Sequence, residues 1–305
     1  MMIKTLLFGA GASAKAFMSN CAEEREFVGI VDNDKNKDGQ VLDGVVICGP
    51  EKLTEFTYDE IVITTQWASE VKTQLIDSLG IAPEKICIPP KSKLKKQTPP
   101  FYNEVTRAFG RKIICELSAI AIERNVPLVL DFGTLLGVIR ECDIIAWDDD
   151  IDMSVPEGFF DLTIDVIERF ISQDNSGVSW QVEKTLDKSG RGMGIVLLFV
   201  DPENSLSDFK TTFSIREFKE GKSIHLPSLG MWFSPEEHFR HAETINWYGN
   251  SIQIPAKAKD YLAFLYGDDW HTPKKNITFS DYANTQAVEF SEFLDAGLHV
   301  DKDTQ

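Results

Sequence analysis

Hydrophobic and polar positions in the first hundred residues alternate between short apolar runs and amphipathic segments. Apolar runs of strand length lie at Ile3–Phe8, Phe27–Val31, Glu60–Thr64 and Ile86–Ile88. Helical spacing occurs between them at Ser13–Asn20 and Ala68–Leu79. Val41–Ile47 predicts a hairpin around Asp43-Gly44. Strands that alternate with helices predict an α/β domain, with a parallel sheet covered by helices on both faces.

The pattern changes after residue 100, where a long amphipathic helix comes first. Its apolar residues recur every three or four positions at Val105, Phe109, Ile113, Leu117 and Ile120. Further elements are predicted as strands at Leu128–Leu130, Ile195–Val200 and Phe209–Phe218 and as helices at Leu135–Arg140 and Lys257–Tyr266. This mixture without regular alternation predicts an α+β domain.

A basic stretch bracketed by prolines, Pro89–Pro100, separates the two patterns. It is poor in apolar residues, which is typical of a linker. We therefore predict a first domain over residues 1–90, a linker over 91–100 and a second domain over 101–305.

The chain carries a net charge of −17, and the excess of acid lies in its second half. Residues 1–100 hold 12 Lys and Arg against 14 Asp and Glu, whereas residues 101–305 hold 19 against 34. Nucleic acids and anionic membranes are bound by basic faces, so this charge argues against both as partners.

The cysteines and the N-terminus bear on the compartment. Five cysteines with no CxxC pair predict a reducing, cytoplasmic environment. The apolar run Thr5–Phe8 is too short for a signal peptide, and no run approaches the ~18 apolar residues of a transmembrane helix. We expect any membrane-linked substrate to be reached by peripheral association at the inner membrane face.

A glycine-rich turn follows the first predicted strand. Gly9-Ala10-Gly11-Ala12-Ser13-Ala14 fits the pattern GxGxxA, and Asp32 ends the next predicted strand about 20 residues later. Such a turn lets the backbone and a helix N-terminus approach a phosphate. Gly9, Gly11 and Asp32 are therefore candidate nucleotide-binding residues. The alternative is a sheet that serves regulation or assembly.

Residues 1–90 resemble the Rossmann-like N-terminal domains of polysaccharide-biosynthesis proteins, such as sugar O-acyltransferases and epimerase/dehydratase relatives. The resemblance rests on Leu7–Gly11, Val28–Asp34 and Gly44–Leu53. The YxxxK pair of short-chain dehydrogenases does not occur in these residues, so redox chemistry is disfavoured.

The segment Trp147–Met153 is rich in carboxylates between apolar neighbours. In an extended strand, Asp148, Asp150 and Asp152 would share one face and Asp149 the other. Three adjacent carboxylates repel one another unless a cation is bound, and such oxygen-rich sites suit Mg²⁺ or Mn²⁺. We predict Asp150 and Asp152 as metal ligands and all three aspartates as catalytic residues; the alternative is an acidic surface turn.

A second glycine turn, Asp131–Gly137, lies between a predicted strand and helix upstream of the aspartates. Gly133 and Thr134 offer backbone N–H groups and a hydroxyl to a phosphate. Arg140, which ends this helix, is a further substrate-binding candidate that could instead pair with Glu141. A turn of this kind followed by paired aspartates is the layout of nucleotidyltransferases.

These motifs resemble the LicD family. The resemblance rests on Leu130–Arg140, on Ile145–Asp152 and on Tyr266–Pro273, and it covers about residues 101–280. It implies a nucleotidyltransferase-like fold and a transferase of surface-glycan biosynthesis, as in capsule or lipopolysaccharide assembly. A phospho-alcohol, typically phosphocholine, would pass from a CDP-alcohol to a hydroxyl of a glycan acceptor, with release of CMP. His271, in the second motif, is a substrate-binding candidate.

Two departures from the family pattern leave alternatives open. Phe132 replaces the usual serine, and Phe209–Ile215 lacks the carboxylate that many members carry on a later strand, where Asp208 or Glu217 could substitute. The chain could instead be a nucleotidyltransferase that uses an NTP donor, or an inactive nucleotide-binding scaffold. Sequence patterns leave the transferred alcohol and a homo-oligomeric state open.

Overall fold

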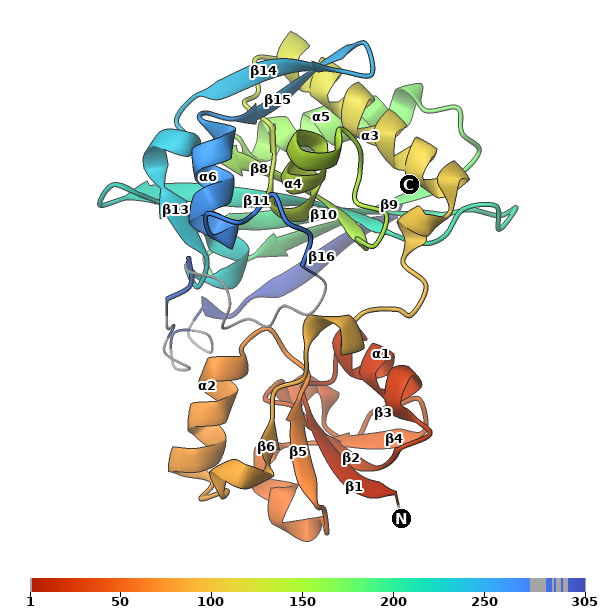
Figure 1. Cartoon of the computed structure of the whole chain (residues 1–305), viewed down its shortest axis with the longest axis vertical. Coiled ribbons are helices and arrows are strands. Elements are labelled where there is room, and N and C mark those ends of the chain that lie inside the picture. Colours follow the sequence, from red (N-terminus) through yellow and green to blue (C-terminus); the bar gives the residue numbers. More distant parts are fainter. Residues whose placement is uncertain (1, 275–283, 287, 289–291, 293–295, 305) are drawn as a thin grey trace. The chain divides into compact units, whose positions relative to one another are not determined.

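The computed structural model describes residues 2–274, 284–286, 288, 292 and 296–304. The chain divides into two compact units (Figure 1). The first is built from Met1–Gln97 and also takes in Pro273 and Lys274, and the second begins at Thr98. The division falls inside the segment that we predicted as a linker.

The first unit contains a six-stranded sheet in the order β3-β4-β2-β1-β5-β6. The strands are β1 (Ile3–Phe8), β2 (Arg25–Val31), β3 (Val41–Leu42), β4 (Val45–Cys48), β5 (Glu60–Ile63) and β6 (Ile86–Cys87). All neighbours pair in parallel except β3 and β4, which form the predicted hairpin.

Two helices cover opposite faces of this sheet. The helix α1 (Ala12–Cys21) packs Phe17 against Leu7 and Ile30, whereas α2 (Ala68–Thr73) packs Val71 against the other face. A π-helical turn over Gln74–Ser78 extends α2, and Gly80 follows with a φ of 66°. The parallel sheet with helices on both faces is confirmed.

The second unit contains an eight-stranded sheet with a branched order. Its main path is β13-β12-β11-β10-β9-β16, and β8 joins it by pairing with β11, while β7 pairs with β8. The strands are β7 (Val129–Leu130), β8 (Asp150–Pro156), β9 (Ser179–Leu186), β10 (Gly192–Val200), β11 (Lys210–Lys219), β12 (Lys222–His225), β13 (Phe233–Pro235) and β16 (His299–Thr304). Among these pairs only β8 and β11 run parallel.

Helices and a separate hairpin pack around this sheet (Figure 1). The helices are α3 (Glu104–Glu123), α4 (Phe132–Glu141), α5 (Phe160–Gln173) and α6 (Ala258–Tyr266), and the hairpin is β14 (Ala242–Trp247) with β15 (Asn250–Pro255). All contribute to one hydrophobic core. The sequence patterns missed α5, β9 and the strands after β11, but both halves show the expected mixture of helices and strands.

Helix α3 begins and ends where its sequence requires. Asn103 accepts hydrogen bonds from the backbone N–H groups of Val105 and Thr106, which caps the first turn. Asn125 adopts a left-handed φ of 55° after the helix ends, and Val126 and Leu128 continue into the core. The chain thereby enters β7 and reaches the glycine turn at Asp131. No helix in the described part of the chain is long and apolar enough to span a membrane.

Candidate active site

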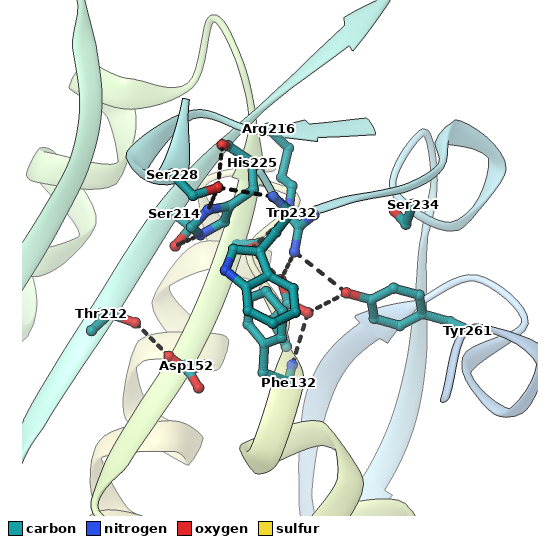
Figure 2. Close-up of polar contacts among 12 residues, drawn as sticks. Phe132, Asp152, Thr212, Ser214, Arg216, His225, Ser228, Trp232, Ser234 and Tyr261 are labelled. Atoms are coloured by element: carbon teal, nitrogen blue, oxygen red, sulfur yellow. Dashed lines mark hydrogen bonds and ion pairs between the residues drawn. The ribbon is translucent and has the colours of Figure 1, made fainter. Parts of the chain in front are cut away.

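Helix α4 begins at a fully buried carboxylate, Asp131. Its Oδ1 accepts the backbone N–H of Phe132 at 2.8 Å and the hydroxyl of Tyr261 at 2.6 Å. Its Oδ2 accepts the hydroxyl of Ser154 at 2.5 Å and pairs with the guanidinium of Arg216. Figure 2 shows the Arg216 guanidinium and the Tyr261 hydroxyl pointing toward each other, 3.3 Å apart. Asp131 thus ties the start of α4 to β8, β11 and α6.

The partners of Asp131 are as buried as the carboxylate itself. Arg216 is 1% exposed, and its guanidinium lies 4.4 Å from the ring centre of Phe239 and 5.3 Å from that of Phe132. Burial and Asp131 raise the pKa of Tyr261, so its hydroxyl stays protonated and donates. Because buried charges are costly unless paired, this cluster holds the glycine turn in one geometry.

Phe132, which departs from the family's usual serine, is part of the same cluster. Its φ of 41° is left-handed, a strained conformation for an aromatic residue. Its ring packs edge-on against His225 and Trp232, at centroid distances of 5.7 and 6.0 Å (Figure 2). A serine could not make these ring contacts. Phe132 is therefore part of the aromatic packing around Arg216.

Three carboxylates gather where the chain enters β8. Asp148 and Asp149 precede the strand, and Asp150 is its first residue. One oxygen atom from each lies within 4.8 Å of those of the other two. The predicted alternation, with Asp149 on the opposite face, was therefore wrong, because the strand begins two residues later than the acidic run.

Asp152 lies further along β8, on the same face as Asp150. It accepts the Thr212 hydroxyl at 2.8 Å (Figure 2), and its backbone N–H donates to the Thr134 hydroxyl at 2.9 Å. Burial, followed by the charges of Asp150 and Asp148, raises its pKa well above the usual value. The carboxylates of Asp148, Asp150 and Asp152 therefore interact electrostatically.

Gly133 lets the acidic cluster approach the first turn of α4. A Cβ built on Gly133 would overlap Oδ2 of Asp148 and lie 3.2 Å from its Cγ. Only a glycine leaves that space for the carboxylate without a shift. Oxygen ligands therefore collect beside a helix N-terminus, where unpaired N–H groups favour anions. This donor set fits a divalent cation such as Mg²⁺ or Mn²⁺.

Strand β11 supplies the other wall of this site. Its parallel register places Lys210 opposite Asp150 and Thr212 opposite Asp152. Glu217 pairs with Arg191 at 3.2 Å, seven residues along the strand from Lys210, or about 23 Å at the usual rise. Glu217 therefore does not replace the expected carboxylate. Asp208 lies two residues before β11, at the correct end.

The predicted substrate-binding residues occupy different environments. Gly133 is partly exposed, whereas Thr134 is buried and its hydroxyl is engaged by β8. Arg140 pairs with Glu141 at 2.6 Å and donates to the backbone oxygen of Trp270 at 3.4 Å. His271 is exposed and stacks on Trp270 with ring centres 3.8 Å apart. The second motif thus reaches the end of α4 through Arg140.

The glycine turn of the first unit is stabilised by the chain itself. Asp32 accepts the backbone N–H of Ala10 at 2.6 Å and the ammonium of Lys37 at 3.0 Å through Oδ2, and the N–H of Asp34 at 2.8 Å through Oδ1. Gly11 is the N-cap residue of α1, with open space around the position of a Cβ. Gly9 has a φ of 110°. A ribose at Asp32 would have to share oxygens that the turn already uses.

Two family models match separate parts of the chain. Residues 125–257 match the family described as LicD/FKTN/FKRP, nucleotidyltransferase domain. Residues 1–87 match the family described as C2185-like, N-terminal. No curated protein sequence matches the chain.

Similarity to solved structures is distant. ANT(2″)-Ia in complex with adenylyl-2″-tobramycin is 14% identical over 51% of this chain and 76% of its own, with a TM-score of 0.31. UDP-D-quinovosamine 4-dehydrogenase from Vibrio fischeri is 21% identical over 26% of this chain and 71% of its own, with a TM-score of 0.23. These scores are too low to support an argument about either unit.

The match over residues 125–257 covers the part of the chain that holds the candidate site. It contains the glycine turn, the acidic cluster and strand β11. Over these residues the second unit is therefore similar to the nucleotidyltransferase domain of the LicD/FKTN/FKRP family.

Proposed function

We propose that the chain transfers a phospho-alcohol from a CDP-alcohol to a hydroxyl of a surface glycan and releases CMP. The observation that carries this proposal is the approach of Asp148 to Gly133, which brings the carboxylate cluster against the N-terminus of α4. A diphosphate needs both features, namely N–H donors for its oxygens and carboxylates that hold a divalent cation. The family match over the same residues supports this donor class.

Each residue of the site has a role in this proposal. Asp150 and Asp152 hold Mg²⁺ or Mn²⁺, and Asp149 is close enough to contribute an oxygen. When bound, the cation neutralises charge on the attacked phosphate and on the leaving CMP. Gly133 presents the helix N-terminus to the diphosphate. Thr134 acts through β8, because its hydroxyl holds the backbone of Asp152.

Asp148 is the proposed base. In this role it accepts the proton of the attacking glycan hydroxyl, while the helix N-terminus and the cluster hold the donor in line. Arg140 is proposed to order the second motif rather than to bind phosphate, since it contacts Glu141 and the Trp270 carbonyl. His271 is exposed, so we retain it as a candidate contact for the acceptor or donor.

The first unit is proposed to bind a nucleotide at the carboxyl ends of β1 and β2. Gly9 and Gly11 follow β1 there, and Lys37 adds a cation that a phosphate could share with Asp32. Ligands of parallel α/β sheets bind at such edges. Loss of UDP or CDP binding on Lys37→Met replacement, measured by calorimetry, is the expected result; unchanged binding would contradict this placement.

The proposed activity is tested by measuring CMP release from a panel of CDP-alcohols with Mg²⁺ and a glycan extract as acceptor. Release should vanish with EDTA and in Asp150→Asn and Asp152→Asn. Asp165→Asn, which removes an exposed carboxylate on α5, is the matched control and should retain activity. Pyrophosphate release from an NTP would instead establish a nucleotidyltransferase. Donor binding without any turnover would establish the scaffold.

A further inference from the structure

Two parallel strands present a continuous polar face beside the acidic cluster. Asp150 lies opposite Lys210, Asp152 opposite Thr212, and Ser154 opposite Ser214. The intervening residues of both strands, Ile151 and Phe213 among them, are buried in the core. Because side chains alternate along a strand, the polar residues of β8 and β11 share the opposite face. Lys210 is therefore placed on the face that carries the proposed site.

The contact of Lys210 differs from those further along this face. Thr212 donates a hydrogen bond of 2.8 Å to Asp152, whereas the Lys210 ammonium lies 3.6 Å from Oδ2 of Asp150. A separation of 3.6 Å is an ion pair without a formed hydrogen bond. The Lys210 side chain is also 50% exposed, against 22% for Asp150. Because half of the side chain is exposed, the ammonium has room to move to another anion within reach.

Charge balance gives this lysine a specific function. Asp148, Asp149 and Asp150 bring their oxygens together, and Asp152 follows on the same strand. The ammonium of Lys210 is attracted by Asp150, Asp152 and Asp149. A divalent cation at Asp150 would compete with the ammonium for the same oxygen, and the displaced ammonium would remain beside the bound diphosphate.

We propose that Lys210 is the second cation of this site: it balances the carboxylates before a metal binds, and it contacts the donor's diphosphate after the metal has taken Asp150. The inference rests on the proposed function, since it assigns a further residue to the same site. It has a consequence that a merely structural ion pair lacks. Removal of the lysine charge should affect metal and diphosphate binding in opposite directions.

The test measures Mn²⁺ alone and CDP in the presence of Mg²⁺, each by titration calorimetry. All proteins carry Lys37→Met, so that CDP binding at the glycine turn of the first unit does not contribute. Lys210→Met should bind Mn²⁺ about fivefold more tightly, because a like charge about 4 Å from the site has gone. The same variant should bind CDP at least about tenfold more weakly, because a charge-assisted contact is lost. Lys210→Arg keeps the charge and should stay near the wild-type values for both ligands.

Lys219→Met is the matched control, since Lys219 is exposed at the other end of β11; it should change neither affinity. Thermal unfolding verifies that each variant is folded, and Lys210→Gln serves as a second neutral variant. Suppose that wild type binds Mn²⁺ and CDP, and that the neutral variants bind both ligands with unchanged affinity or both more weakly. The proposed role of Lys210 is then overturned, while the proposed function stands. If wild type binds neither ligand, the proposed function fails as well.

Discussion

Replacement of Gly133 by alanine should leave the second unit equally or more stable but should lower its proposed activity. Gly133 lies in the first turn of α4, and its φ is not among the left-handed values. The backbone therefore accepts alanine, and helix propensity alone favours alanine over glycine by up to about 1 kcal/mol. The added Cβ would overlap the end of the Asp148 side chain, which can rotate away at low cost. We expect unfolding in urea, without metal, to show equal or higher stability.

Function should respond to Gly133→Ala in the opposite direction. Once the Asp148 carboxylate turns away, the proposed cation loses a negative charge beside its ligands, and the attacking hydroxyl loses its proposed base. We expect Mn²⁺ affinity to fall about tenfold, which corresponds to about 1.4 kcal/mol. Turnover should fall by about a hundredfold, the effect of an error of about 1 Å in a catalytic geometry. Calorimetry with Mn²⁺ and the CMP-release assay measure these two quantities.

A double-mutant cycle determines whether the effect passes through Asp148. In an Asp148→Ala background the clash no longer exists, so Gly133→Ala should change Mn²⁺ binding by less than about 0.5 kcal/mol. An equal loss in both backgrounds would mean that the glycine acts in another way. Wild-type Mn²⁺ affinity in the single Gly133→Ala variant would refute the reasoning outright.

Three further predictions concern the buried groups around the site. Arg216→Met leaves the Asp131 carboxylate buried without its cation and should cost about 3–5 kcal/mol in urea unfolding; a loss below about 1 kcal/mol would contradict the pairing. The raised pKa of Asp152 means that the metal-free protein loses stability as pH rises from about 4 through that pKa. Asp152→Asn should therefore be more stable than wild type at pH 7.5 in EDTA, and a less stable variant would contradict the sign. Burial and then Arg216 lower the pKa of His225 well below its usual value, so stability should fall as pH drops below about 6.5; His225→Gln should flatten that dependence, and identical pH profiles would exclude His225 as its source.

Much of the first unit could be predicted from local patterns. Strand β1 begins and ends as expected, and Gly9, Gly44 and Gly80 mark turns with left-handed φ values. The role of Asp32 could not be predicted in the same way. Its spacing from the glycine turn indicated a ribose contact, but its oxygens accept hydrogen bonds from the chain's own Ala10 and Lys37.

In the second unit the motifs indicated the acidic cluster and the glycine turn but did not determine their geometry. Sequence alternation placed Asp149 on the wrong face, because the point where β8 begins depends on its pairing with β11. Arg216 and Tyr261 were missed, since their partner Asp131 lies 85 and 130 residues away in the sequence. Lys210 was also missed, because only the parallel register brings it to Asp150. The sequence did give one indication. Phe132 stands where the LicD family usually has a serine, and its ring packs against His225 and Trp232.

The central claim is that the carboxylates at the start of β8 hold a divalent cation against the N-terminus of α4. It is tested most directly by anomalous diffraction from crystals grown with Mn²⁺ and CDP. We expect a peak about 2.0–2.2 Å from an oxygen of Asp150, with a second aspartate of the cluster and a CDP phosphate oxygen completing its contacts. CDP bound in the second unit with no Mn²⁺ peak at these aspartates would contradict the claim.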